Sequence, residues 1–228
     1  MINNNNNTDR YWKKYNLSKN KLIKKIIKHN NKFEYNFLEN EHFNHTRDLF
    51  ALSLVNLKKS NDKIKVLDFG SNLLTLVNLN NKINTKNYQF TIFDPFLKNN
   101  TKNIKIKNVK YELTKNKEKI LKKSFKLIHF ASSIQYQKNF LKEINNFNFN
   151  KTEIVIFTYT PFSLKKTYYS QQSNHLNLVQ NVYSLKELIF KLKKMKFNLI
   201  FKSRNEDRYI SCKKKQFKTL SLNLVFQK

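Results

Sequence analysis

The segment Ile64-Lys65-Val66-Leu67-Asp68-Phe69-Gly70 decides the fold of this chain of 228 residues. Its apolar residues form a short run, which predicts a strand that ends at Gly70. Gly70 is the only glycine in the sequence. We interpret it as a position that needs a positive φ or the close approach of a ligand. A plain turn between a strand and a helix explains it equally well.

Short apolar runs alternate with helical patterns on both sides of this strand. Helices are predicted at 41–58, 72–80 and 184–196, and Ser184 and Glu187 have the spacing of a capping box. Further strands are predicted at 88–93, 104–113, 125–131, 153–159, 197–201 and 219–226. Strands that alternate with helices favour an α/β fold, a doubly wound and mostly parallel Rossmann-like sheet, here of seven strands. Because no helix separates the last two strands, the C-terminal edge is predicted to be antiparallel.

The composition divides the chain into three parts. Residues 1–18 include five consecutive asparagines and are predicted to be disordered. Residues 19–60 are predicted to form an N-terminal helical extension, which begins with an apolar stripe at 22–27. Residues 61–228 are predicted to form the Rossmann-like domain.

The charge of the chain restricts its partners. Lys and Arg number 45 against 15 Asp and Glu, a formal net charge of +30. Nucleic acid is therefore one candidate partner, because basic side chains neutralise phosphates. Only four of the basic residues are arginine, the side chain that reads base edges, and the lysines are spread along the whole chain. This pattern fits a coding bias and a solvated surface, so nucleic acid is not the partner that we favour.

Several classes of protein are excluded or disfavoured. A single cysteine, Cys212, excludes a disulfide framework and favours a reducing compartment. No apolar run approaches the roughly 20 residues that span a bilayer, and residues 1–10 lack the apolar core of a secretory signal. We therefore expect a cytoplasmic protein. The sequence contains no phosphate-binding P-loop and no Asp-rich cluster, so no metal site is predicted.

Polar residues follow the predicted strands. In a doubly wound sheet, ligands bind outside the carboxyl ends of the strands. Asp94 follows the second strand, 24 residues after Gly70, close to the spacing at which an acid accepts hydrogen bonds from a ribose diol. Helix capping or an Asp-Pro turn is the alternative for Asp94. The polar and turn residues expected at this edge are Asp68, Gly70, Ser71, Asn72, Asp94, Ser132, Ser133, Gln135, Tyr136, Thr160 and Pro161.

Three elements of the sequence resemble a known family. They are Val66-Leu67-Asp68-Phe69-Gly70, Ala131-Ser132-Ser133-Ile134-Gln135-Tyr136, and Thr160-Pro161-Phe162 followed by Gln171-Gln172. With them the chain resembles class I S-adenosylmethionine-dependent methyltransferases. It is most similar to those encoded among surface-polysaccharide (O-antigen-type) biosynthesis genes. The order and spacing of the elements fit from about residue 33 to residue 204.

The resemblance implies S-adenosyl-L-methionine as cofactor and a role for each element. Asp68, Gly70, Ser71 and Asn72 would hold the methionine part, and Asp94 would hold the ribose. Ser132 to Tyr136 would lie against the adenosine or the acceptor, with Ser132 and Ser133 on the cofactor side and Gln135 and Tyr136 on the substrate side. Thr160, Pro161 and Gln171 or Gln172 would line the acceptor side.

The chain departs from the resembled family at four positions. Members carry further glycines where this chain has Ser71 and Leu74, an arginine at Tyr159 and an acid at Lys126. A side chain at Ser71 narrows the approach to a cofactor, and Leu74 crowds the helix against the strand.

Two histidines bear on the chemistry. Methyl transfer depends on alignment, and a general base helps when the acceptor is a hydroxyl. His175, predicted in a loop beside Gln171 and Gln172, is the candidate base. His129 lies inside the fourth predicted strand and is interpreted as a core histidine with satisfied hydrogen bonds.

Three functions remain open on the sequence alone. We favour a cytoplasmic S-adenosylmethionine-dependent methyltransferase that acts on a small or sugar-linked acceptor in surface-polysaccharide biosynthesis. The second is a nonenzymatic methyltransferase-like protein with a degenerate cofactor loop. The third is a nucleic-acid-associated methyltransferase or binder, which the charge of the chain suggests.

Overall fold

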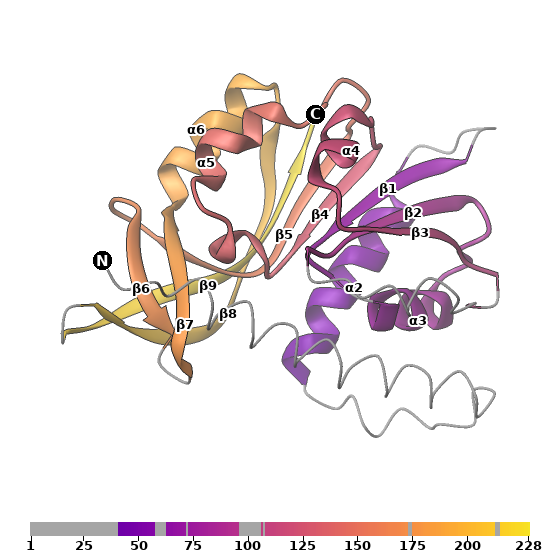
Figure 1. Cartoon of the computed structure of the whole chain (residues 1–228). Helices are drawn as coiled ribbons and strands as arrows, with labels where there is room; N and C mark the ends of the chain where they lie inside the picture. The colour runs from indigo at the N-terminus through magenta and orange to yellow at the C-terminus, as the bar shows by residue number, and fades with distance from the viewer. Residues whose placement is uncertain are drawn as a thin grey trace.

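The computed structural model describes residues 41–57, 63–71, 73–95, 106, 108–172, 175–212 and 215–228. In these residues, nine strands form one mixed sheet (Figure 1). Five parallel strands lie side by side in the order β3-β2-β1-β4-β5. Their bounds are Ile64–Phe69 for β1, Tyr88–Phe93 for β2, Lys110–Thr114 for β3, Leu127–Ala131 for β4 and Ile154–Ser163 for β5.

Two antiparallel hairpins complete the sheet. β8 (Asn198–Cys212) and β9 (Lys215–Gln227) form a long hairpin, and β9 also pairs antiparallel with β5. This pairing confirms the predicted antiparallel C-terminal edge. β6 (Tyr168–Gln172) and β7 (His175–Ser184) form the second hairpin, in which β7 pairs with the end of β5 and β6 pairs with β8. The strands β5, β7, β6, β8 and β9 therefore close into a ring.

The predicted number of seven strands is wrong because of the β6–β7 hairpin. We expected a loop there, after a fifth strand that ended at Tyr159, but β5 continues to Ser163 and His175 lies in β7. The alternation Leu176-Asn177-Leu178 was a period-two signal for a strand that our interpretation missed.

The predicted third strand begins too early. Asn108 has a φ of 62°, and the N–H of Val109 donates to the carbonyl of Ile106 at 3.2 Å. These residues form a turn, and pairing of β3 with β2 begins at Lys110. The apolar side chains of Ile106 and Val109 pack against the core without lying in a strand.

Helices cover both faces of the parallel strands, which confirms the doubly wound arrangement (Figure 1). One face carries α2 and α3, and the other carries α4, α5 and α6 with the 3-10 turns η3 and η4. The bounds are Glu41–Val55 for α2, Leu73–Lys82 for α3, Lys117–Lys122 for α4, Ile134–Tyr136 for η3, Phe140–Glu143 for α5, Ile144–Asn146 for η4 and Leu185–Lys194 for α6.

Aromatic rings fill the core between the sheet and α5. Phe130 of β4 stacks on Phe157 of β5 with ring centroids 4.9 Å apart, and it meets the edge of Phe140 of α5 at 5.1 Å. All three side chains are buried. Offset-stacked and edge-to-face pairs are the preferred geometries of aromatic rings, so a chain poor in alanine and rich in phenylalanine still packs a dense core.

The start of α6 follows the predicted cap only in part. The hydroxyl of Ser184 accepts from the N–H of Glu187 at 3.4 Å, which confirms Ser184 as N-cap. The N–H of Ser184 itself donates to the hydroxyl of Thr167 at 3.0 Å. Thr167 therefore takes the place that a capping box gives to the glutamate.

Little of the predicted N-terminal region is described. The expectations for residues 1–18 and for the stripe at 22–27 lie outside the described residues. Within 19–60 the structure describes α2, whose Phe50 and Leu54 are fully buried against the sheet. The helix is therefore part of the domain core.

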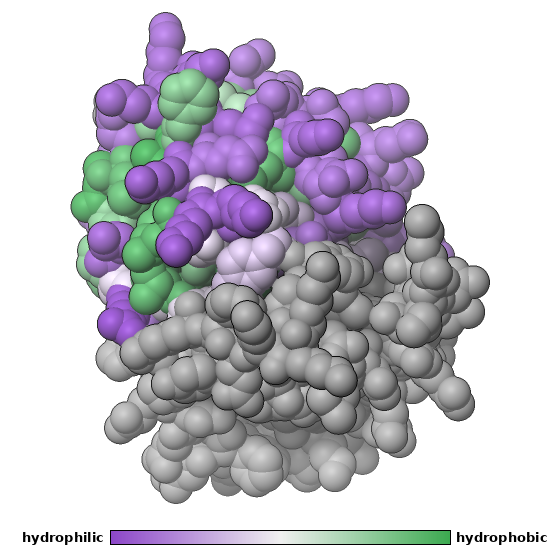
Figure 2. Space-filling view, turned by 90° about the vertical axis from the view of Figure 1, so that its left-hand side faces the viewer, coloured by the Kyte–Doolittle hydropathy of each residue, from purple (hydrophilic) through white to green (hydrophobic). Residues whose placement is uncertain are grey.

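Among the residues that Figure 2 colours, hydrophilic ones cover most of the surface and a smaller hydrophobic area lies beside them. Exposed apolar side chains in the described residues include Phe190 of α6 and Ile200 of β8. Among the described helices, none is long and apolar enough to cross a membrane.

Candidate functional site

The strand register brings together the ends of β1, β2 and β4. Phe69 pairs with Phe93 on one side and with Phe130 on the other. The residues that follow, among them Gly70 and Asp94, therefore lie at the same carboxyl edge. The N–H of Gly70 donates to the carbonyl of Phe93 at 2.8 Å, which fixes the turn after β1 against the end of β2.

Gly70 is required for two reasons. Its φ is 79°, in the left-handed region that favours glycine. A Cβ placed on it would lie 2.0 Å from the Cβ and 2.4 Å from the Oγ of Ser133. Ser133 is buried, and its hydroxyl donates to the carbonyl of Phe69 at 2.8 Å. The positive φ is thus confirmed, and the group that approaches Gly70 closely is a side chain from the loop after β4.

Ser71 does not extend into open space. Its side chain is buried, and its hydroxyl lies 2.6 Å from that of Thr75 in the first turn of α3. The side chain of Ser71 is therefore held against the helix. Asn72 and the side chain of Leu74 lie outside the described part of the chain.

Asp68 belongs to a buried polar network. One carboxylate oxygen, Oδ1, lies 2.9 Å from Nδ1 of His129, and Nε2 of His129 lies 2.8 Å from the hydroxyl of Thr158. The ring of Phe50 covers His129 with centroids 4.3 Å apart. His129 is a core histidine with both nitrogens bonded, as interpreted. The other oxygen of Asp68, Oδ2, has no hydrogen-bond partner among the described residues.

Strained backbone lies just after β4 and within β5, where the register with β9 shifts between Phe157 and Thr160. Ser132 has a φ of 48° and Tyr159 a φ of 50°, although neither is glycine. The hydroxyl of Ser132 donates to the carbonyl of Tyr159 at 3.0 Å, and the amide of Gln135 donates to the carbonyl and the hydroxyl of Ser132. Such strain clusters at binding sites, where the surrounding structure holds it in place. The residue types at these two positions did not predict the positive φ angles.

The residues predicted on the acceptor side fall into two groups. Thr160 and Pro161 lie inside β5 with buried side chains, and the hydroxyl of Thr160 donates to the carbonyl of Thr158 at 3.1 Å. Gln171, Gln172 and His175 lie in the β6–β7 hairpin, where Gln172 and His175 are register partners. The side chains of these three residues are outside the described ones.

Tyr183 joins β7 to the loop after η3, a link that the sequence analysis missed. Its hydroxyl donates to the carbonyl of Gln137 and accepts from the N–H of Phe140. Asn181 also donates to the carbonyl of Gln137, at 3.2 Å. Burial raises the pKa of Tyr183 to about 12, so its hydroxyl keeps its proton at neutral pH. The hairpin is thereby fixed beside η3, which carries Gln135 and the half-buried Tyr136.

Comparisons with known proteins show the fold. No protein-family model and no curated protein matches the sequence. The structure is similar to that of magnesium protoporphyrin IX methyltransferase (ChlM) from Synechocystis PCC 6803 with bound SAM. That likeness has a TM-score of 0.52 and 9% identity, and it covers 100% of this chain and 99% of that chain. The same enzyme with bound SAH gives a TM-score of 0.51 at 9% identity, over 97% and 100% of the two chains. The chain has the fold of class I S-adenosylmethionine-dependent methyltransferases.

Proposed function

We propose that this protein is an S-adenosylmethionine-dependent methyltransferase with its cofactor site at the carboxyl edge of β1, β2 and β4. The supporting observation is the convergence of Gly70, Asp94 and Ser132 at that edge, in a chain with this fold. When bound, S-adenosylmethionine supplies an electrophilic methyl group on a sulfonium. The residues of the chain have to hold and align the reactants, because alignment contributes up to about 7–11 kcal/mol in favourable systems.

The described residues fit such a ligand. Asp94 follows β2 with a half-buried side chain, and a carboxylate there can accept hydrogen bonds from both hydroxyls of a ribose. The unpartnered oxygen of the buried Asp68 fits a ligand that brings a donor, such as the ammonium of the methionine part. Gly70, Ser71 and Asn72 would contact that part through their main chain. Ser132 and Ser133 would lie beside the adenosine.

For the acceptor, we favour a small or sugar-linked molecule between η3 and the β6–β7 hairpin. Gln135 and Tyr136 would approach from η3, and Gln171 or Gln172 from the hairpin. His175 is the proposed general base for a hydroxyl acceptor. Thr160 and Pro161 would form the floor of this site from within β5. The roles in surface-polysaccharide biosynthesis and in the cytoplasm rest on the sequence resemblance and on the single cysteine.

Calorimetric titration with S-adenosylmethionine and S-adenosylhomocysteine tests the proposal. Micromolar binding supports a cofactor site. No heat at millimolar ligand would contradict it and would favour the nonenzymatic alternative.

The ribose assignment has its own test in Asp94→Ala. Loss of hydrogen bonds to a charged group costs about 1.5–3 kcal/mol, so we expect roughly 10- to 100-fold weaker cofactor binding and little change in stability. Glu118→Ala, which removes an exposed carboxylate from α4, serves as the control. Unchanged affinity in a folded Asp94→Ala protein would refute the assignment.

A further inference from the structure

A basic surface lies at the amino-terminal edge of the sheet, opposite the proposed cofactor site. A cavity of about 550 Å³ is lined there by ten residues, five of them lysines and one of them, Glu153, an acid. A second cavity of about 340 Å³ adjoins it, because both are lined by Lys65 and Ser124. We call the two cavities together the amino-edge surface. Its lysines are Lys63, Lys65, Lys122, Lys123, Lys126, Lys151 and Lys228.

The backbone ladder fixes part of this surface in a row. The N–H of Lys126 donates to the carbonyl of Lys65 at 2.8 Å. In the same way, the N–H of Glu153 donates to the carbonyl of Lys126 at 2.9 Å, and the N–H of Lys228 donates to the carbonyl of Glu153 at 3.0 Å. Neighbouring strands lie about 4.8 Å apart, so four charged residues are held side by side across four strands. The position of these charges is therefore set by the sheet itself.

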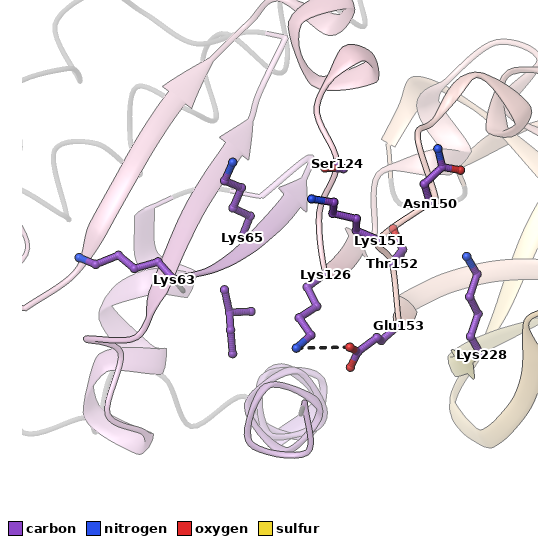
Figure 3. A pocket seen from close by; sticks show the side chains of 10 residues that line it. Lys63, Lys65, Ser124, Lys126, Asn150, Lys151, Thr152, Glu153 and Lys228 are labelled. Carbon is purple, nitrogen blue, oxygen red and sulfur yellow. Dashed lines mark ion pairs between the residues drawn. The ribbon is translucent and has the colours of Figure 1, made fainter. Parts of the chain in front are cut away.

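The turn that carries Lys151 is fixed against the segment before β4. Ser124 forms an isolated bridge with Asn148, and the hydroxyl of Thr152 donates to the carbonyl of Phe125 at 2.8 Å. Figure 3 shows Lys65 and Lys151 on opposite sides of a gap near Ser124, whereas Lys63 extends away from them. Lys65 and Lys151 are exposed, and neither has a carboxylate partner among the described residues.

The acids near this surface neutralise only part of its charge. Glu153 lies 3.3 Å from Lys126, and Glu112 pairs with Lys123. Lys228 donates to the carbonyl of Phe149 and lies over the ring of Phe197. An anion that contacts both Lys65 and Lys151 would be attracted by two positive charges that no described carboxylate neutralises.

We propose that the amino-edge surface binds the phosphodiester backbone of a nucleic acid without reading its sequence. Lysine binds phosphate as a point charge, whereas arginine forks read base edges and exposed aromatic rings stack on unpaired bases. The surface has neither arginine nor exposed aromatic side chains among its lining residues, and its apolar members Ile64 and Phe125 are buried. Two adjoining cavities suit an extended chain of phosphates better than one compact anion. The site is separate from the carboxyl edge, so its failure and the failure of cofactor binding are distinguishable.

Fluorescence anisotropy with labelled 20-nucleotide oligo(U) and oligo(dT), from 50 to 200 mM salt, tests this proposal on the full chain. Each phosphate contact on a single strand contributes about 0.7 to the slope of log affinity against log salt, so Lys65→Gln with Lys151→Gln should reduce the slope by about 1.4. The ratio of wild-type to variant affinity should then shrink about sevenfold across this fourfold range of salt. Lys65→Arg with Lys151→Arg keeps both charges and should keep the slope.

Lys186→Gln with Lys202→Gln removes the same charge from exposed positions on α6 and β8 outside both cavities and serves as the control. A control slope close to that of the wild type supports a defined site. Equal loss in the two double variants would overturn the proposal, because the binding would then come from the overall charge. Binding of inorganic tripolyphosphate that the oligonucleotides do not displace would also overturn it, in favour of a small anion. Absence of oligonucleotide binding at 50 mM salt would also overturn the proposal.

Discussion

Gly70→Ala tests how the turn after β1 is built. The methyl group would meet the Cβ of Ser133 at 2.0 Å in a backbone whose φ is 79°. The left-handed backbone costs a residue with a side chain about 1–2 kcal/mol, and overpacking a tight contact costs about 1–3 kcal/mol. We therefore expect a loss of about 2–5 kcal/mol in the free energy of unfolding, a large part of the stability of an ordinary domain. Urea unfolding followed by circular dichroism measures it as a lower midpoint with an unchanged slope.

A second substitution at Ser133 separates the two causes. Ser133→Gly removes the atoms that the new methyl group would meet, whereas Ser133→Ala keeps the Cβ that lies at 2.0 Å. In the Gly70→Ala background, Ser133→Gly should therefore show a favourable coupling of about 1–3 kcal/mol, and Ser133→Ala, which removes only the Oγ at 2.4 Å, should show a smaller one. A loss below about 1 kcal/mol for Gly70→Ala, or strictly additive effects with Ser133→Gly, would refute this account of the turn.

Two further predictions concern buried polar groups. His129→Ala leaves the buried carboxyl of Asp68 without its partner and opens a cavity beside Phe50. We therefore expect the free energy of unfolding, measured with urea, to fall by about 2–5 kcal/mol. A fall below about 1 kcal/mol would show that the network contributes little. Burial raises the pKa of Tyr183 to about 12 in the folded state, so folded protein holds a proton that unfolded protein releases near pH 10. The stability that the Tyr183 hydroxyl contributes is complete below about pH 10 and is lost as the pH rises through 12. Between these values the free energy of unfolding of Tyr183→Phe should therefore fall less steeply with pH than that of the wild type. An equally steep fall in both proteins would contradict the raised pKa of Tyr183.

The sequence predicted those helices and strands whose first or last residue is fixed by a single residue type, such as a glycine or a capping serine. β1 was predicted without error at Ile64–Phe69, because a short and mostly apolar run ends at the only glycine. The start of α6 was predicted because Ser184 has a hydroxyl that caps the free N–H of Glu187. The β6–β7 hairpin was missed because its pairing depends on β5 and β8. Strand pairing depends on such partners as much as on the alternation within the strand.

The candidate site was predictable in its location more than in its contacts. The strand order places Gly70 and Asp94 at one edge, as the alternation of strands and helices implied. The pairing of Asp68 with His129, however, joins residues 61 positions apart. The approach of Ser133 to Gly70 and the strained backbone at Ser132 and Tyr159 also depend on long-range packing. No pattern within a short window of sequence contains that information.

The sequence by itself determined the type of fold, the order of its parallel strands along the chain and the turn at Gly70 after β1. These features follow from the periodicity of apolar residues and from the conformational range of single residues, which act over a few positions. The tertiary structure decided which polar groups are buried together, how the two hairpins close the ring with β5, and where lysines from distant segments gather at the amino edge. Those outcomes depend on which strands become neighbours, and that choice is made by burial of the whole core rather than by any one segment.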